Sequence, residues 1–410
     1  MRSEAVLSLR PRLRVVRPGE LAPAAARARA ERSARRVLTV ASLSTALLSA
    51  TGLVMVLSAS SVSAFAAYGS SFLFFKRQLL YAAMGSVALL GAARLPYRAW
   101  KRAWAPLLAM SVLLLALVLH PGAGTVVGGA ARWIQVGPLS LQPSELAKFA
   151  VVASVAAILS QSMDRLVAEP LRWMLPMFLV VGGVCLLVLL QPDLGTMTVI
   201  AATAFLMLFL AGVQLRLLAI SFVLSAGAGV ALVLGWGYRR ARLLSFLHPW
   251  SDPRNSGYQI VQSLIALGSG HVFGVGLGAS RQKWMYVPNA HTDFIFAILG
   301  EELGLVGELV VLGLFAALLW AGVRIALRAP DPFGKLLAGG ITAWLGLQAF
   351  VNLGAVTGIL PITGVPLPFV SFGGSSLIVS MGAVGVLLSV GRAGLRGKQR
   401  RAPTGRRRTR

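Results

Sequence analysis

Ionisable side chains stand directly beside long apolar runs at three places in this sequence. An ionised group at membrane depth costs about 2.5 to 3.5 kcal/mol on the insertion scale, so each one needs a partner or a function. In the segment 291–302, His291 and Asp293 precede the apolar residues FIFAILG, and Glu301 follows them. Desolvation at such a boundary raises the pKa of a carboxylate toward the range of a general base. Asp293 is therefore a candidate base, with the N-cap of the following helix as its alternative role.

The other two stretches are QPSELAK at 142–148 and QPDLGT at 191–196. In the first, Gln142 precedes a Pro-Ser helix start, and Glu145 and Lys148 lie three residues apart on one helical face. This pair either stabilises the start of the helix or forms a polar wall of a substrate cavity. In the second, Asp193 lies in a tight turn and is expected to cap the next helix.

Cations and hydroxyl groups near these stretches suit an anionic or sugar ligand. Arginine binds phosphate in a bidentate manner, although a long basic side chain can instead reach a lipid headgroup. The loop 360–373 is rich in proline and leads to an apolar run, so its serines either bind a sugar or cap that helix. The candidate ligands are Lys148, Arg239, Arg240, Arg242, Lys283, Ser371 and Ser375.

Metal chemistry is limited by the residues available. Cys185 is the single cysteine and the four histidines are scattered, so no tight zinc site is expected. A carboxylate and substrate phosphate oxygens could still share Mg²⁺ or Mn²⁺.

The elements that must position these groups are membrane helices. The chain has 410 residues, 56% hydrophobic and 13% charged, which excludes an ordinary soluble domain. A bilayer core needs roughly 20 apolar residues per helical span. The sequence therefore predicts an all-α polytopic membrane protein. Its ten predicted spans fall at 38–60, 78–95, 104–120, 145–161, 172–190, 196–213, 216–236, 303–327, 336–359 and 374–393.

The formal charge of +26 lies mostly in two tails, 1–37 and 394–410. Basic tails beside spans follow the positive-inside rule, so both termini are expected to be cytoplasmic and disordered, lying against anionic headgroups, with no nucleic-acid partner. The ten-span domain is then 38–393. Its longest extracytoplasmic loop, 237–302, joins spans seven and eight. That loop is too long and too apolar to be structureless, so we expect interfacial helices and re-entrant pieces.

Taken together, the motifs resemble the SEDS family (shape, elongation, division and sporulation) of peptidoglycan glycosyltransferases, which includes FtsW, RodA and SpoVE. The resemblance covers almost everything between the tails, and the run Ser58 to Ser61 and the basic tails resemble FtsW more than RodA. Phe372 stands where tyrosine is more usual in the family. The matching segments are 52–61, Arg132-Trp133-Ile134, QPSE-x-x-K, QPDLGT, Gly257-Tyr258-Gln259, HTDFIF-x-x-x-GEELG and LPFVSFGGSS, which contains Pro368.

The resemblance implies polymerisation of lipid II outside the cytoplasmic membrane, with Asp293 as the catalytic carboxylate and functional roles for Glu145 and Lys148. It also implies a class B penicillin-binding protein and other divisome membrane proteins as partners, at the septum. One carboxylate suffices, because pyrophosphate leaves as an anion and mainly needs cations around it. The remaining alternatives are an elongation polymerase of the RodA type, a flippase of lipid-linked precursor and a divisome scaffold.

Overall fold

The computed structural model describes residues 18–122, 124–127, 130–137, 139–161, 169–234, 246, 248–255 and 257–400. Every predicted span overlaps an apolar helix of this part of the chain, and seven described helices are long and apolar enough to cross a membrane. The prediction of an all-α polytopic fold is thus confirmed. The helices are α1 (Pro18–Tyr68), α2 (Leu73–Arg94), α3 (Arg98–Leu119), α4 (Pro143–Ser160), α6 (Pro170–Leu190), α7 (Leu194–Leu210), α8 (Leu215–Leu234), α10 (Tyr258–Ser269), α11 (Ile295–Leu327), α12 (Pro332–Val356) and α13 (Gly374–Arg400), with a short 3₁₀ helix η1 (Pro249–Ser251).

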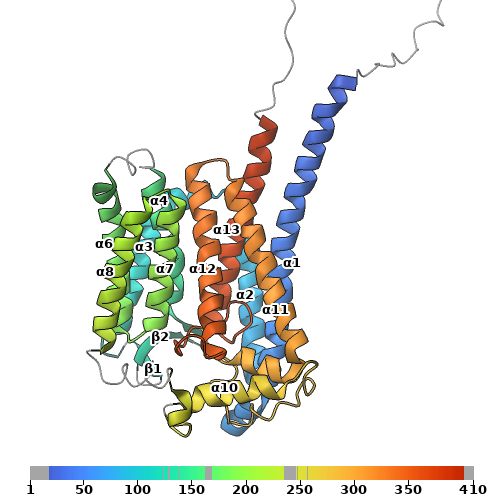
Figure 1. Cartoon of the computed structure of the whole chain (residues 1–410), viewed down its shortest axis with the longest axis vertical. Helices are drawn as coiled ribbons and strands as arrows, with labels where there is room; N and C mark the ends of the chain where they lie inside the picture. The colour runs from blue at the N-terminus through green and yellow to red at the C-terminus, as the bar shows by residue number, and fades with distance from the viewer. Residues whose placement is uncertain are drawn as a thin grey trace, which may run out of the picture.

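The helices form one bundle with two different ends (Figure 1). Helix α10 lies across one end, and the basic parts of α1 and α13 extend beyond the other. Helix α10, which lies in the loop predicted at 237–302, is thus at the end opposite the basic tails. We call the first of these the α10 end.

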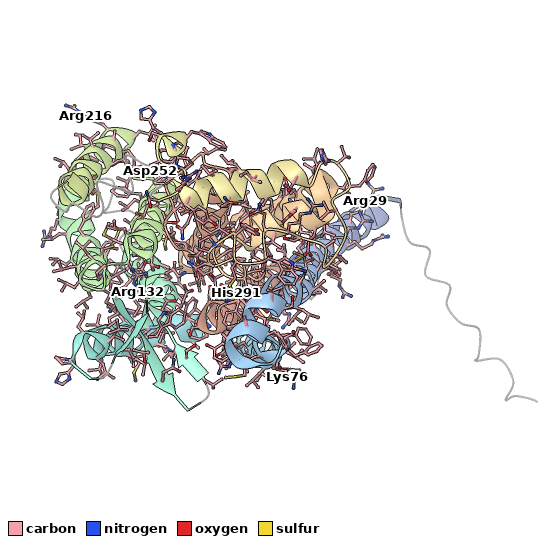
Figure 2. The ribbon with its side chains drawn as sticks, turned by 90° about the horizontal axis from the view of Figure 1, so that it is seen from below. Arg29, Lys76, Arg132, Arg216, Asp252 and His291 are labelled. Atoms are coloured by element: carbon pink, nitrogen blue, oxygen red, sulfur yellow. The ribbon has the colours of Figure 1, made fainter. Side chains whose placement is uncertain are left out.

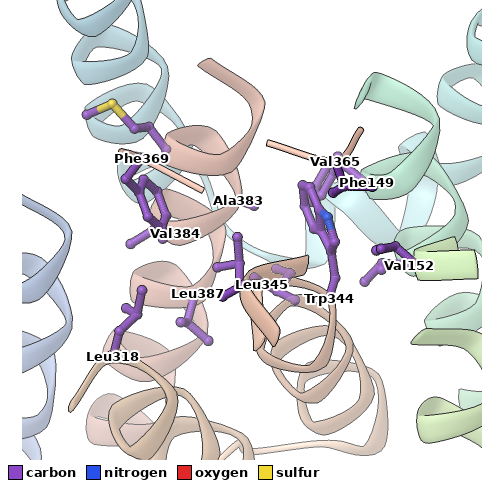
Figure 3. Close-up of a cluster of buried hydrophobic side chains, with 14 of the residues drawn as sticks. Phe149, Val152, Leu318, Trp344, Leu345, Val365, Phe369, Ala383, Val384 and Leu387 are labelled. Carbon is purple, nitrogen blue, oxygen red and sulfur yellow. The ribbon is translucent and has the colours of Figure 1, made fainter. Parts of the chain in front are cut away.

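Helices α4, α12 and α13 form the centre of the bundle and are mostly buried inside the protein. Helix α4 contains many alanines, including Ala147, Ala150 and Ala153, which allow neighbouring backbones to approach closely. A buried apolar cluster around Trp344 and Val365 joins α4 to α12 (Figure 3). The polar residues of the centre are therefore held in a tightly packed environment.

Two parts of the chain differ from the prediction. Helix α1 begins at Pro18 and α13 continues to Arg400, so much of the tails predicted to be disordered is helical. Extending an existing helix through a sequence rich in Ala, Arg and Glu avoids the cost of nucleation. The segment 121–144 also contains an unpredicted antiparallel sheet of order β1-β2-β3, formed by Thr125–Val127, Ala130–Val136 and Leu139–Leu141.

Helix α11 begins at Ile295 and is broken at Gly304, where φ is 64° and ψ is −167°. The part of α11 after this break coincides with the predicted span 303–327, and the part before it lies in the segment predicted as a loop. The segment 271–276 supplies hydrogen bonds to both sides of this break. Val275 N–H donates to Glu301 O at 2.9 Å, and His271 O accepts from Leu305 N–H at 3.0 Å. Non-helical backbone at membrane depth persists only where the protein satisfies it in this way. This segment and α10 lie in the part of the chain for which re-entrant and interfacial elements are predicted.

Candidate active site

Asp293 lies in the turn that leads into α11, at the α10 end of the bundle. Its side chain is half-buried, and a Cβ added at Gly364 would lie 3.6 Å from its Oδ2. Asn352 Nδ2 donates to the backbone O of Asp293 at 2.8 Å. The N-cap of α11 is Phe294, which makes no side-chain cap, so the alternative role of Asp293 as that cap is not what the structure has.

His291 packs between two aromatic rings two residues before Asp293. The ring centroids of Phe74 and Phe372 lie 4.7 and 5.7 Å from that of His291. Burial lowers the pKa of His291 to about 4, so the imidazole is neutral at pH 7. Its backbone O accepts from Phe372 N–H at 2.9 Å. His291 therefore ties the Asp293 turn to the loop 360–373 (Figure 2, which labels His291).

Glu145 and Lys148 form an ion pair that is enclosed by the bundle. Lys148 Nζ lies 2.9 Å from both carboxylate oxygens of Glu145, and each side chain is only 1% exposed. Lys148 Nζ also donates to Gln348 Oε1 at 2.6 Å and lies 5.5 Å from the ring centroid of Trp344. A buried charge is stable only when paired and hydrogen-bonded, and these contacts provide both. Of the two predicted roles, the contacts support the stabilising one.

Two amides on α12 were missed by the sequence reasoning. Gln348 accepts from Lys148 and from Trp344 Nε1, at 2.9 Å for the latter, and donates to Pro366 O at 2.9 Å. Asn352 donates to Val365 O at 2.8 Å as well as to Asp293 O. Their spacing of four residues within an apolar helix places them on one face, and this pattern is a signal that could have revealed them.

The candidate serines bond to the protein backbone. Ser371 Oγ accepts from Leu367 N–H at 2.9 Å, and Ser375 Oγ accepts from Gln142 N–H at 2.9 Å and donates to Ser140 O at 3.2 Å. Both serines are buried, as is Pro368 in the same loop. In this structure Ser371 stabilises the loop 360–373 internally, and Ser375 joins the start of α13 to residues 140 and 142.

The turn between α6 and α7 is held by Asp193 and Arg132. Asp193 Oδ1 accepts from Thr196 N–H at 3.1 Å, which confirms its predicted capping role. Arg132, on β2, donates to Gln191 O at 3.0 Å and also to Pro192 O. The sheet is thereby attached to this turn at the α10 end, where Figure 2 labels Arg132.

Glu301 organises the segment 280–282. Its carboxylate accepts from Ser280 Oγ at 2.5 Å and from the N–H groups of Arg281 and Gln282 at 2.9 and 3.3 Å. A carboxylate that accepts several donors in this way fixes a loop rather than meeting a substrate directly.

Lys283 is buried against Glu302, a third residue to which the sequence assigned no role. Lys283 Nζ lies 3.5 Å from Glu302 Oε1 and donates to Gly278 O at 2.5 Å. Ser58 Oγ, on α1, donates to Glu302 at 2.6 Å. Lys283 is thus already paired in this structure, and Ser58 belongs to the motif at the end of the first span.

Of the remaining candidates, one lies in α10 and three fall outside the described part of the chain. A recess of about 620 Å³ is lined by Arg281, Gln282, Trp284 and Tyr286. Gln259 lies in the first turn of α10. Among the described residues, no three His, Cys, Asp or Glu side chains gather as a metal site. The predicted cations Arg239, Arg240 and Arg242 fall outside the described residues.

The fold and the site define an integral membrane protein of many helices, with a half-buried carboxylate at one end of the bundle and a buried polar network beneath it. The chain belongs to the FtsW/RodA/SpoVE family of cell cycle proteins, whose match covers residues 38–394.

Curated relatives extend over most of the chain. It is 46% identical to stage V sporulation protein E of Bacillus subtilis over 349 residues, which is 85% of this chain and 95% of the relative. It is also 46% identical to the probable peptidoglycan glycosyltransferase FtsW of Geobacter metallireducens over 339 residues, 83% of this chain and 90% of the relative.

Solved structures share the fold. One, described as the structural coordination of polymerization and crosslinking by a peptidoglycan synthase complex, matches with a TM-score of 0.71 and 32% identity over 86% of this chain and 96% of the other. The rod shape determining protein RodA of Thermus thermophilus matches with a TM-score of 0.63 and 31% identity, covering 85% of this chain and 95% of that one.

Proposed function

We propose that this chain is a peptidoglycan glycosyltransferase that polymerises lipid II into glycan strands at the outer face of the cytoplasmic membrane. Relatives that cover most of its length carry this enzyme name, and the family is one of cell cycle proteins. The observation that carries the assignment is the position of Asp293, half-buried at the end of the bundle opposite the basic termini. The positive-inside rule makes that end the outer one.

In the proposed reaction Asp293 is the general base. Its carboxylate accepts the proton of the 4-hydroxyl group on the GlcNAc sugar of the acceptor. The oxygen of this hydroxyl group then bonds to C1 of the MurNAc sugar of the donor. The bond from C1 to the pyrophosphate oxygen breaks, and the electron pair leaves with the lipid pyrophosphate. The configuration at C1 is inverted. No second carboxylic acid is required, because pyrophosphate is a good leaving group without protonation.

The leaving pyrophosphate needs positive charge. Lys148 and Lys283 are already paired with Glu145 and Glu302, so exposed Arg281 at the recess and the cations Arg239, Arg240 and Arg242 are the better candidates. The described residues do not form a three-ligand metal site by themselves, so Mg²⁺ or Mn²⁺ would depend on substrate phosphate oxygens. Metal binding is therefore proposed only in the presence of substrate.

The cellular setting follows from the same comparisons. We place the protein in the cytoplasmic membrane with both termini inside, at the division septum, because its FtsW and sporulation relatives are more similar to it than the RodA structure is. A class B penicillin-binding protein is the proposed partner, since a solved neighbour is a peptidoglycan synthase complex that polymerises and crosslinks. Other divisome membrane proteins would join this complex.

The test is polymerisation of purified lipid II by the full-length protein in liposomes. Asp293→Asn should lower the rate about 10²- to 10⁴-fold, the usual contribution of a general base. Asp252→Asn is the matched control, because it makes the same change at a site that Figure 2 shows apart from His291, and it should keep full activity. Unchanged polymer from Asp293→Asn would refute the base assignment. Lipid II translocation without polymer from the parent protein would instead indicate a flippase.

A further inference from the structure

We infer that Gln348 and Asn352 form an amide bracket on α12 that positions Asp293, and that Lys148 acts on the reaction through this bracket and not by contact with pyrophosphate. The inference rests on the proposed function, because it concerns how the base is held. The amide bracket means these two side chains together with the carbonyl groups they hold, those of Pro366, Val365 and Asp293.

The bracket has a simple geometry. Gln348 and Asn352 are four residues apart, about 6 Å along one face of α12, and both are fully buried. Each donates to a neighbouring carbonyl of the loop 360–373, and Asn352 reaches the Asp293 turn with the same amide. One helical face thus sets the spacing between that loop and Asp293.

The loop needs side chains to hold it, because three of its residues are prolines, which lack a backbone donor. Pro361, Pro366 and Pro368 have no N–H group and cannot contribute to a backbone ladder. Buried carbonyl groups in such a segment must find donors elsewhere. The amides of α12 donate to the carbonyl groups of Val365 and Pro366, the two residues that follow Gly364. A Cβ added at Gly364 would approach the Asp293 carboxylate.

The amide of Asn352 is used for donation. Among the described residues its Oδ1 has no hydrogen-bond partner, although it is buried. A leucine of similar size would bury no unpaired side-chain oxygen, but it would take this donor away from Val365 O and Asp293 O. The contribution of asparagine at this position is therefore its two donated hydrogen bonds, which hold Val365 O and Asp293 O close together.

Lys148 determines which way Gln348 points. Lys148 Nζ and Trp344 Nε1 are both donors, so the atom of Gln348 that meets them must be the oxygen. The amide nitrogen then faces Pro366 O, which it holds at 2.9 Å. Glu145 fixes Lys148 from the other side. With both charged side chains 1% exposed, the pair has no surface for a pyrophosphate, and its effect on the site passes through Gln348.

The experiment measures lipid II polymerisation by three variants of the full-length protein. Asn352→Leu removes both donated hydrogen bonds. Gln348→Glu, as an ionised carboxylate beside Lys148, still accepts from Lys148 and Trp344 but cannot donate to Pro366 O. Glu145→Gln/Lys148→Met removes both charges together, so that no unpaired charge remains buried. Ser263→Ala is the control, because it deletes another buried hydrogen bond to α12, the one to Val356 O at 2.7 Å, outside the bracket.

Misplacing a reacting group by about 1 Å costs about 10²-fold in rate. We expect kcat to fall about 10- to 100-fold in each bracket variant, with KM for lipid II within about twofold and a cooperative thermal unfolding transition, as in Ser263→Ala. Inhibition by added undecaprenyl pyrophosphate should be unchanged in the Glu145/Lys148 variant, whereas direct contact with pyrophosphate predicts weaker inhibition. If Asn352→Leu does not fold, Asn352→Ser loses the reach to both carbonyl groups and gives the same readout.

Four outcomes separate the ideas. Normal kcat in Asn352→Leu and Gln348→Glu, with Asp293→Asn inactive, overturns the bracket and leaves the proposed function in place. Weaker pyrophosphate inhibition in the Glu145/Lys148 variant overturns the indirect role of Lys148. Full activity in Asp293→Asn overturns the role of Asp293 as base, on which the bracket depends, whereas absence of polymer from the parent protein overturns the proposed function itself.

Discussion

The break in α11 provides a sharp test of how this fold is held, through the substitution Gly304→Ala. Gly304 has φ of 64° and ψ of −167°, a region open essentially to glycine alone. A Cβ added there would overlap with the backbone N of Gly274 and lie 2.6 Å from Val272 O. The substitution must therefore push the segment 271–276 away from the break.

The cost has two parts. Holding alanine in this backbone conformation costs about 1 to 3 kcal/mol. Displacing the segment 271–276 also weakens its backbone hydrogen bonds to residues 301, 302, 305 and 306, each worth about 0.5 to 1.5 kcal/mol. The total is several kcal/mol, which is a large fraction of the stability of a typical domain.

The assay is thermal unfolding of the purified protein in detergent, with amide hydrogen exchange of residues 271–276. Gly304→Ala should lower the apparent midpoint strongly and raise exchange in that segment. Gly313→Ala, in the same helix with open space around its added Cβ, should be neutral or stabilising by up to about 1 kcal/mol. An unchanged midpoint and unchanged exchange for Gly304→Ala would refute the role of the break.

Three further predictions follow from the contacts around the site. Asp193→Ala should destabilise the protein by about 1 kcal/mol through loss of the α7 cap, while Asp193→Asn, which still accepts from Thr196 N–H, should be close to the parent in thermal unfolding. The pKa of His291 is about 4 in the folded protein and ordinarily 6.5, so the unfolded chain binds more protons between these two pH values. The free energy of unfolding should therefore fall as the pH drops from 6.5 to about 4. His291→Phe should flatten this part of the profile of stability against pH. Lys283→Met leaves the buried Glu302 carboxylate without its cation and should destabilise the protein by about 3 to 5 kcal/mol. The double variant Lys283→Met/Glu302→Gln should recover most of that loss. Equal thermal unfolding midpoints for the single and the double variant would contradict the pairing.

Several features could be read from the chain alone because they are local. The spans depend only on runs of about 20 apolar residues, and the start of α4 at Pro143 and the cap at Asp193 depend on neighbouring residues. The same reasoning singled out Asp293 beside an apolar segment. Its prediction of disordered tails differed from the structure, because helix propagation into residues 18–37 depends on the span that nucleates it.

Other features depend on residues far apart in the chain. The three short strands are stabilised by pairing with one another, and the break at Gly304 needs donors and acceptors from residues 271–276. Lys148 and Gln348 are 200 residues apart in sequence but share a hydrogen bond. No periodicity or spacing could have predicted such a contact.

The sequence by itself determined that this chain is a bundle of membrane helices with its basic ends on one side and its acidic motifs on the other, since hydropathy and charge act residue by residue. Only the tertiary structure decided which charged groups are enclosed and which face outward. Burial and hydrogen-bond partners are set by helices that meet in space, and they turn Glu145 and Lys148 into interior supports while Asp293 stays half-buried at the α10 end.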